Sequence, residues 1–455
     1  MARLLLERIS HLVTLDDSMR QYEGAYLLIE DGVISDLGEM SQVPSFENID
    51  YRVDCSGLVI LPGLINTHHH FYQTLTRNLP ACQDAKLFDW LTYLYEIWAK
   101  LPPEALRIGV LVASAELLSS GCTTAVDHAY VYPSGSGDMF SVEVNALRES
   151  QIRSYLCRGS MSLSKDDGGL PPRSVVQKDE EILEHSSRVI DDYHDESDLA
   201  MLKVVLAPCS PFSVTPEIMR DTAELAKERS VLIHTHLAET EDENEFCLAR
   251  SGKRPTAYLD ELGWIDSNAF FAHCVWLNEE EISLLAARNA GVAHCPTSNM
   301  RLGSGIAPIV PMLDAGVKLS IAVDGSASND SSNMIAEARQ ALLLQRVKYG
   351  ASSLSGSQVL RMATRGGAEV LNRSSLGSLE KGKAADLIGI ETDTLEYAGA
   401  LSDPALAPIF CFTKGVSLSV VNGEVLIERG EFKKLDVEKI IAEHNSLAQK
   451  LLDSD

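Results

Sequence analysis

The stretch Leu61-Pro62-Gly63-Leu64-Ile65-Asn66-Thr67-His68-His69-His70 begins as an aliphatic run and ends in three consecutive histidines. The run predicts a buried strand, so the histidines are expected at its carboxyl end. His68 and His70 are two residues apart, and on an extended backbone both imidazoles point to the same side. His69 then points away, and we assign it a structural role. The pattern predicts a pair of histidine ligands at one end of a sheet or barrel.

Three further blocks share this design, an aliphatic run that ends in polar residues. In chain order they are His234-Thr235-His236-Leu237-Ala238-Glu239, Ala272-His273-Cys274 and Val323-Asp324-Gly325. Together with the first block they supply nitrogen and oxygen donors, an acid and a base. These groups are what a protein needs to hold one divalent metal and to activate water on it. One histidine alone is as often a core or surface residue, but four blocks in this order predict a site.

The middle of the chain predicts a parallel α/β fold. Between residues 61 and 368, strand-like runs alternate with helical stretches such as 217–229, 278–290 and 333–348. This alternation is typical of a parallel sheet with covering helices, and the number of repeats fits a (β/α)8 TIM barrel. The segment 134–180 is rich in Gly, Ser, Pro and charged residues, and we expect its middle to be a mobile surface loop.

The two ends of the chain differ from the middle. Short strand-like runs dominate both 1–60 and the part after 368, and the pairs Asp31-Gly32 and Asn422-Gly423 are hairpin signals. We therefore expect residues 1–60 and 369–455 to form one small β-sandwich domain, with the barrel inserted between its halves. An amphipathic pattern over 434–453 predicts a C-terminal helix that closes this domain.

The composition narrows the choice of partners. The net charge of the 455 residues is −26, so the chain cannot neutralise phosphates in bulk, and we expect no nucleic-acid partner. A small neutral or cationic substrate agrees better with this charge. The nine cysteines form no CxxC pair, which indicates reduced thiols and a cytoplasmic protein. No apolar stretch approaches the ~20 residues of a membrane span, so we expect no membrane partner.

The order of the four blocks resembles the metal-binding motifs of the amidohydrolase superfamily, specifically its aminohydrolase (deaminase) branch. The resemblance covers essentially the whole chain, from Pro62-Gly63-Leu64-Ile65 entering the barrel to Gly382-Lys383-Ala384-Ala385-Asp386-Leu387 leaving it. It implies one divalent metal, with Zn²⁺ as the default and Fe²⁺ as the alternative, because imidazole and carboxylate suit both ions. His234 matches a variable position and is not assigned to the metal. The implied ligands are His68, His70, His236 and Asp324.

Many members of this superfamily bind two metals through a carbamylated lysine at the end of the fourth barrel strand. The only nearby candidate is Lys203, which stands at the start of the run Leu202–Pro208. That is the wrong end of the barrel, so the sequence favours a mononuclear site over a hydantoinase-type or dihydroorotase-type enzyme. The other zinc deaminase design, HxE with PCxxC, is absent from the chain.

The resemblance also implies a division of roles between three catalytic residues. Asp324 can accept the proton of the attacking water, and His273 is placed beside that water. Glu239 lies three residues after His236 and is not expected to bind metal; it would protonate the ring nitrogen next to the carbon under attack. The alternatives are structural: Glu239 could belong to an acidic helix start, and His273 could be a buried histidine with satisfied hydrogen bonds.

The substrate is indicated by the stretch that follows the first histidines. In guanine deaminases and their relatives, a glutamine at the position of Gln73 hydrogen-bonds the ring amide of the substrate. Residues 68–84 closely resemble bacterial 8-oxoguanine deaminases. The implied reaction is the hydrolytic deamination of free 8-oxoguanine to urate and ammonia. Isoxanthopterin deaminase and hydroxydechloroatrazine-type triazine aminohydrolase are the alternatives, because they share much of this stretch.

Cys82 and the helix that follows it are each open to two interpretations. Cys82 could contact the C8 carbonyl of the substrate or be a small buried apolar residue. A predicted helix over 84–100 is rich in aromatic residues, most of them for packing, although one could stack on a purine. Asn299 is expected to shape its loop rather than to touch substrate.

A homo-oligomer is expected from the resemblance alone. From a different class of function, the chain could be a metal-free scaffold, which would contain no stoichiometric metal.

Overall fold

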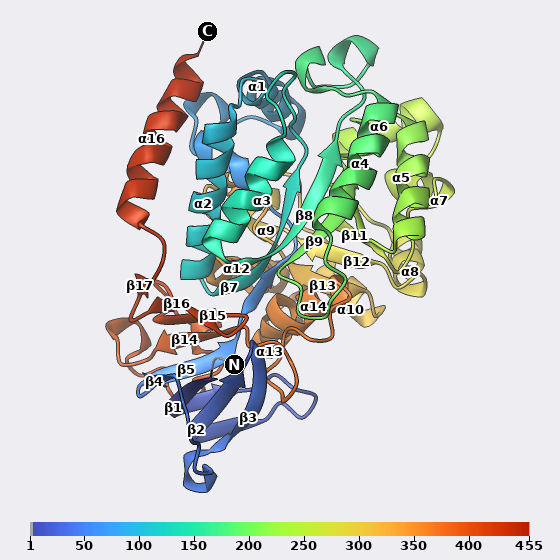
Figure 1. Ribbon diagram of the computed structural model, residues 1–455. Coiled ribbons are helices and arrows are strands. Elements are labelled where there is room, and N and C mark those ends of the chain that lie inside the picture. Colours follow the sequence, from blue (N-terminus) through green and yellow to red (C-terminus); the bar gives the residue numbers. More distant parts are fainter. Residues whose placement is uncertain (1–2, 455) are drawn as a thin grey trace.

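The computed structural model describes residues 3–454 and contains a closed barrel of eight parallel strands (Figure 1). Around the ring the strands follow the order β10-β11-β12-β13-β6-β7-β8-β9. This arrangement confirms the predicted TIM barrel. Its strands are β6 (Leu64–Asn66), β7 (Cys122–Ala129), β8 (Arg153–Ser160), β9 (Leu202–Pro208), β10 (Ile233–Leu237), β11 (Ala269–His273), β12 (Gly291–His294) and β13 (Lys318–Ile321).

Helices follow the barrel strands and cover the outside of the barrel (Figure 1). Local sequence explains where they begin. The helix from Pro216 places a proline where its missing N–H costs nothing, and the Thr215 side chain accepts a hydrogen bond from Ile218 N. Among residues 3–454, no helix is both long and apolar enough to cross a membrane.

The helices of eight residues or more are α1 (Leu87–Trp98), α2 (Pro103–Ser119), α3 (Met139–Ser150), α4 (Asp179–Tyr193), α5 (Pro216–Arg229), α6 (Glu241–Ser251), α8 (Glu279–Ala287), α12 (Met334–Tyr349) and α16 (Val437–Asp453). The shorter ones are α7 (Pro255–Glu261), α9 (Pro296–Arg301), α10 (Ile309–Asp314), α11 (Ser326–Asn329), α13 (Gly356–Arg361), α14 (Gly367–Val370) and α15 (Ala407–Phe410).

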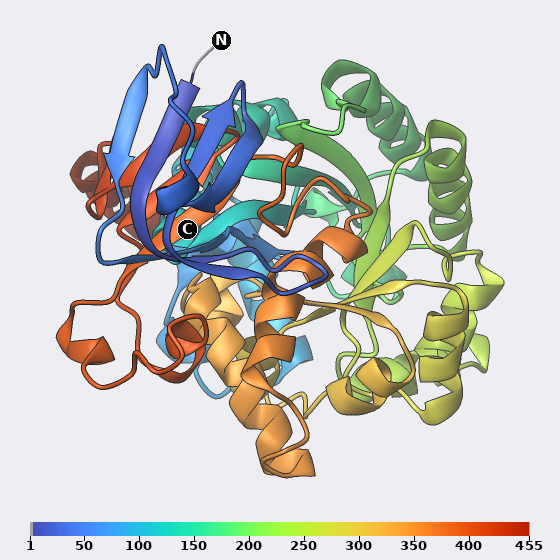
Figure 2. The ribbon, with the colours of Figure 1, turned by 90° about the horizontal axis from the view of Figure 1, so that it is seen from below.

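Both ends of the chain form one mixed sheet below the barrel (Figure 2). Strand β14, from the second half of the chain, pairs antiparallel with β5, so the two ends share one sheet. This confirms that both ends of the chain build one β sheet apart from the barrel; the bounds 1–60 and 369–455 stay a prediction, and residues 1–2 and 455 lie outside the described range. Its strands are β1 (Arg3–Val13), β2 (Gln21–Glu30), β3 (Val33–Glu39), β4 (Tyr51–Asp54), β5 (Leu58–Pro62), β14 (Leu387–Glu391), β15 (Leu418–Val421), β16 (Glu424–Glu428) and β17 (Glu431–Phe432).

Two local predictions were wrong. The middle of 134–180 is not a loop, because α3 and β8 occupy it and bury Phe140 and Val144 in the barrel core. The predicted C-terminal helix exists as α16, but it packs on α2 of the barrel rather than on the β domain (Figure 1). His444 of α16 lies with Nε2 3.0 Å from Thr74 Oγ1 of the barrel. An amphipathic pattern shows that a helix has an apolar face, but not which surface covers it.

A buried ion pair joins the barrel to the β domain. Arg153 on β8 donates from Nε to Asp386 Oδ2 at 2.7 Å and from Nη2 to Oδ1 at 2.9 Å. Asp386 precedes β14 and also accepts a hydrogen bond from Asn422 N at 2.7 Å. The Arg153 side chain is fully buried, so removal of the carboxylate would leave its charge without an ionic partner.

We therefore predict that Asp386→Ala lowers the free energy of unfolding by about 3–5 kcal/mol, measured by urea denaturation. The control is Asp167→Ala, which breaks the exposed pair between Asp167 and Arg173 and should cost less than about 1 kcal/mol. Equal effects of the two substitutions would show that the buried pair does not hold the domains together.

Candidate metal centre and active site

The four sequence blocks meet at the carboxyl end of the barrel, on the side covered by α1 (Figure 1). His68 and His70 follow β6, His236 lies within β10, His273 ends β11, and Asp324 follows β13. All five side chains are buried. Parallel strands place their carboxyl ends at one edge, which is why blocks far apart in the sequence converge here.

His68 presents an unprotonated nitrogen to the centre of this group. His234 Nδ1 lies 2.8 Å from the carbonyl oxygen of Phe270, and a carbonyl can only accept, so His234 Nδ1 carries the hydrogen. Burial lowers the pKa of His234 to about 3, so the ring is neutral and its Nε2 accepts from His68 Nδ1 at 2.7 Å. His68 Nε2 is left as a buried lone pair without a hydrogen-bond partner.

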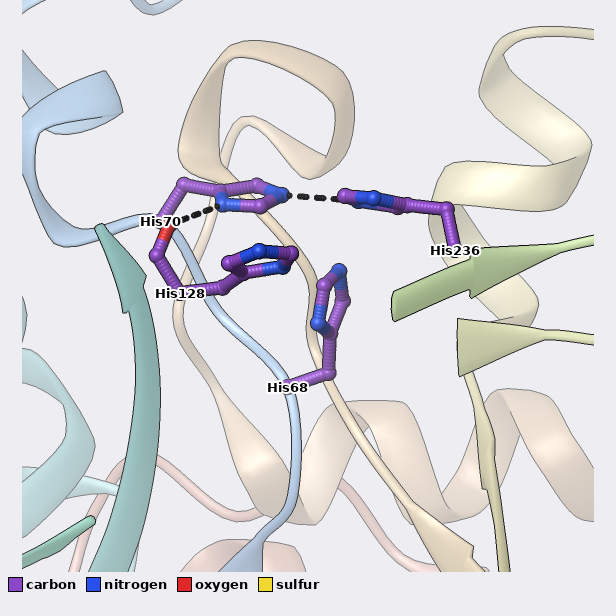
Figure 3. Close-up of side chains that lie close together, drawn as sticks. All are labelled: His68, His70, His128 and His236. Carbon is purple, nitrogen blue, oxygen red and sulfur yellow. Dashed lines mark hydrogen bonds between the residues drawn. The ribbon is translucent and has the colours of Figure 1, made fainter. Parts of the chain in front are cut away.

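His70 and His236 are fixed in the same way. His70 Nδ1 donates to the carbonyl oxygen of His128 at 2.8 Å, and His236 Nδ1 donates to that of Cys209. Burial lowers the pKa of both rings, so their Nε2 atoms are bare as well. Figure 3 shows these two nitrogens facing each other, 3.2 Å apart. Two lone pairs at this distance repel each other unless a cation lies between them.

Asp324 adds an oxygen to the three nitrogens. Its Oδ1 lies 3.3 Å from His68 Nε2 and 3.4 Å from His70 Nε2. Its Oδ2 accepts hydrogen bonds from the hydroxyls of Ser298 at 2.5 Å and Ser328 at 3.2 Å. These donors stabilise the ionised carboxylate and orient it. Three imidazole nitrogens and a carboxylate suit a divalent transition metal, and no protein hydrogen satisfies the nitrogens, so the residues fit the expected ion.

Glu239 and His273 lie beside this cluster and form a pair. Glu239 Oε2 is 3.5 Å from His273 Nε2, which in turn is 3.9 Å from Asp324 Oδ2. Burial raises the pKa of Glu239 to about 7, although His273 opposes the shift. Burial disfavours the charged form of His273, but Glu239 and Asp324 outweigh it and raise its pKa. The pair can therefore hold or release a proton near neutral pH.

The backbone is strained at two of these positions. His273 and Asp324 have φ angles of 72° and 64°, in the left-handed region that residues with a side chain rarely adopt. Such conformations cost on the order of 1–3 kcal/mol each and persist where the surrounding structure holds them. They aim both side chains into the barrel mouth at the point where the strands end.

A cavity adjoins the cluster. Glu239, His273 and Asp324 line it from the barrel, and Trp90 and Tyr95 line it from α1. Gln73 also lines the cavity, and its buried Oε1 has no hydrogen-bond partner. A Cβ atom on Gly325 would lie 1.9 Å from that oxygen, so only glycine leaves room for Gln73 in this position.

The remaining predicted residues lie elsewhere. Cys82 is buried in the hydrophobic core, in a short 3-10 helix (Pro80–Cys82), and does not line the cavity. The structure therefore supports its reading as a small apolar residue. Lys203 is the second residue of β9, at the end of the barrel away from the cluster. Its Nζ donates to the carbonyl oxygen of Asp195, as expected for a lysine without a metal.

Sequence reasoning missed several residues of the site. His128 lies near the end of β7 and stacks against His236, with ring centroids 5.0 Å apart (Figure 3). The sequence pattern that could have identified His128 is a histidine at the end of an aliphatic run, as in the other blocks. His234 was left without a role, yet it orients His68. Asn299 was expected only to shape a loop, but its Oδ1 accepts from His273 Nδ1 at 2.9 Å.

We predict that His234→Phe weakens zinc binding by about 10- to 100-fold, because His68 loses the acceptor that fixes its tautomer. Phenylalanine preserves the stacking on Phe270, where the ring centroids are 4.1 Å apart. The measurement is the zinc dissociation constant from competition with a chelator. His185→Phe, outside the cluster, is the control. An unchanged constant in His234→Phe would remove His234 from the metal centre.

Comparison with known proteins agrees with this geometry. Residues 59–426 match the Amidohydrolase family. The 8-oxoguanine deaminase of Pseudomonas aeruginosa is 48% identical over 94% of this chain and 94% of its own length. The hydroxydechloroatrazine ethylaminohydrolase of a Pseudomonas species is 35% identical over 96% of this chain and 93% of its own length.

A solved structure extends the likeness to three dimensions. Atrazine chlorohydrolase from Arthrobacter aurescens, in complex with zinc, superposes with a TM-score of 0.93 at 31% identity, over 98% of this chain and 100% of that one. The chain belongs to the amidohydrolase family and is a metal-binding hydrolase that acts on C–N bonds.

Proposed function

We propose that this enzyme uses one Zn²⁺ ion to hydrolyse 8-oxoguanine to urate and ammonia. One observation carries the proposal: a cavity brings Glu239, His273 and Gln73 together beside a cluster of unprotonated histidines. The 48% identity to the 8-oxoguanine deaminase of Pseudomonas aeruginosa supports this choice of substrate. In the reaction, water adds at the carbon that carries the 2-amino group, and the bond from that carbon to nitrogen breaks.

The residues that would hold the ion are His68, His70, His236 and Asp324. When bound, zinc supplies the Lewis acidity that lets water lose a proton near neutral pH. The carboxylate of Asp324 can accept that proton, because its Oδ1 faces the cluster while Oδ2 is held by Ser298 and Ser328. Fe²⁺ is the alternative ion for the same ligands.

Glu239 supplies the second proton transfer. With a pKa raised to about 7 by burial, it holds its proton near neutral pH. It can donate that proton to the ring nitrogen next to the carbon under attack, which makes the carbon more electrophilic. His273 Nε2 lies between Glu239 and Asp324 and orients the attacking oxygen. The proton taken up by Asp324 can then pass to the amino group, which leaves as ammonia, while Glu239 recovers a proton from the added hydroxyl as the carbonyl forms.

Gln73 positions the substrate. Its unpartnered Oε1 can accept a hydrogen bond from a ring N–H, and its amide nitrogen can donate to the adjacent carbonyl. A ring amide of a purine presents this pair of groups. Without such a ligand the oxygen stays buried and unpaired, which is unfavourable.

Two related activities are the alternatives. Isoxanthopterin deaminase is 35% identical over 87% of this chain, and the triazine aminohydrolase named above is equally similar. The test is ammonia release from zinc-loaded protein with 8-oxoguanine, guanine, isoxanthopterin and a hydroxy-triazine in parallel. The proposal predicts the highest kcat/KM for 8-oxoguanine, with urate absorbance. Release from only the pterin or the triazine would overturn the substrate and leave the reaction type in place.

We predict that Glu239→Gln keeps the metal but loses turnover by at least about 100-fold, because the proton donor is gone while the ligands remain. Metal content and kcat are measured on the same preparation. Glu241→Gln, on an exposed helix start, is the matched control and should retain activity. Loss of the metal in Glu239→Gln would contradict the assigned role.

A further inference from the structure

The side of the cavity that α1 forms, which we call its roof, contains a hydrogen-bond donor without a partner. Trp90 lies on α1, which covers the barrel mouth (Figure 1), and its side chain lines the cavity. The residue is only 3% exposed, and its indole Nε1 is buried without a hydrogen-bond partner. The other indoles that can be compared are satisfied: Trp98 donates to Thr76 Oγ1 and Trp264 to the carbonyl oxygen of Met219.

The chemistry of this donor restricts what can satisfy it. An indole N–H only donates, so it requires an acceptor, and leaving it buried and unpaired is costly. The apolar residues that line the same cavity, Leu87, Leu91, Phe212 and Leu302, offer no acceptor, and no side chain of the described residues accepts from this N–H. A ligand that carries a carbonyl oxygen toward the roof would supply one.

The proposed reaction fixes which end of a purine faces the roof. The carbon that bears the 2-amino group must lie on the opposite side of the cavity, beside Glu239 and the histidine cluster. C8 is at the opposite end of a purine from C2. In 8-oxoguanine C8 carries a carbonyl oxygen, whereas in guanine it carries hydrogen.

We infer that Trp90 Nε1 donates a hydrogen bond to the C8 carbonyl of the substrate and is the residue that selects 8-oxopurines over guanine. This inference rests on the proposed function and deepens it. It transfers to Trp90 the contact predicted from the sequence for Cys82, which does not line the cavity. A site built to hydrogen-bond one substrate group discriminates against an analogue that lacks it.

The first experiment compares substrates in Trp90→Phe, which keeps an aromatic ring and removes the N–H. We expect the ratio of kcat/KM for 8-oxoguanine to kcat/KM for guanine to fall by about 5- to 100-fold, because the C8 oxygen becomes a buried acceptor without a donor. Trp264→Phe, which removes a buried N–H far from the cavity, should leave the ratio unchanged. Trp90→His keeps a ring N–H and should restore part of the preference. An unchanged ratio in folded Trp90→Phe overturns the inference.

The second experiment does not depend on turnover. Urate carries a C8 oxygen and one more ring N–H than xanthine, so the change in the ratio of their inhibition constants between the wild-type and Trp90→Phe enzymes reports the contact of the indole. We expect urate to bind more tightly than xanthine to the wild-type enzyme and the difference to disappear in Trp90→Phe. If 8-oxoguanine is not deaminated but this difference holds, the proposed function fails and the Trp90 contact stands. Equal binding of urate and xanthine to the wild-type enzyme overturns the contact.

Discussion

Three buried imidazole nitrogens, on His68, His70 and His236, have lone pairs that no hydrogen of the protein satisfies. Each is fixed because the opposite ring nitrogen donates to a backbone carbonyl or to His234. Without a cation such an arrangement is unfavourable, since the lone pairs repel one another in a site with little screening. The barrel supports this arrangement, because His68 and His70 follow β6 and His236 lies on β10 of the same closed sheet.

The same centre explains the neighbouring features. Glu239 lies beside His273 at the edge of this cluster, and its burial raises its pKa to about 7. The strained backbone at His273 and Asp324 aims both side chains into one small volume. Gly325, directly after Asp324, leaves room for Gln73, so one turn of the chain positions residues on both the cluster and the cavity. The histidine cluster and the residues that line the cavity therefore lie at the same carboxyl end of the barrel strands.

The sequence predicted the barrel correctly, and the residues predicted as ligands lie in one cluster, because both depend on local patterns. Aliphatic runs that end in His or Asp identify strand ends, and parallel strands bring those ends together. It failed where the outcome depends on tertiary packing. The helix α16 packs its apolar face on α2 of the barrel. The segment around α3 is ordered because residues such as Phe140 are buried, although glycine and serine are frequent on both sides of it. Likewise, neither the hydrogen-bond directions around His234 nor the position of Trp90 in the roof is encoded in a motif.

The most direct test of this account is the metal content of the purified protein, measured by elemental analysis together with protein concentration. We expect one divalent ion per chain, because the candidate donor atoms His68 Nε2, His70 Nε2, His236 Nε2 and Asp324 Oδ1 belong to one cluster. A protein without stoichiometric metal, even after incubation with zinc, would contradict it and favour a non-catalytic role for this barrel.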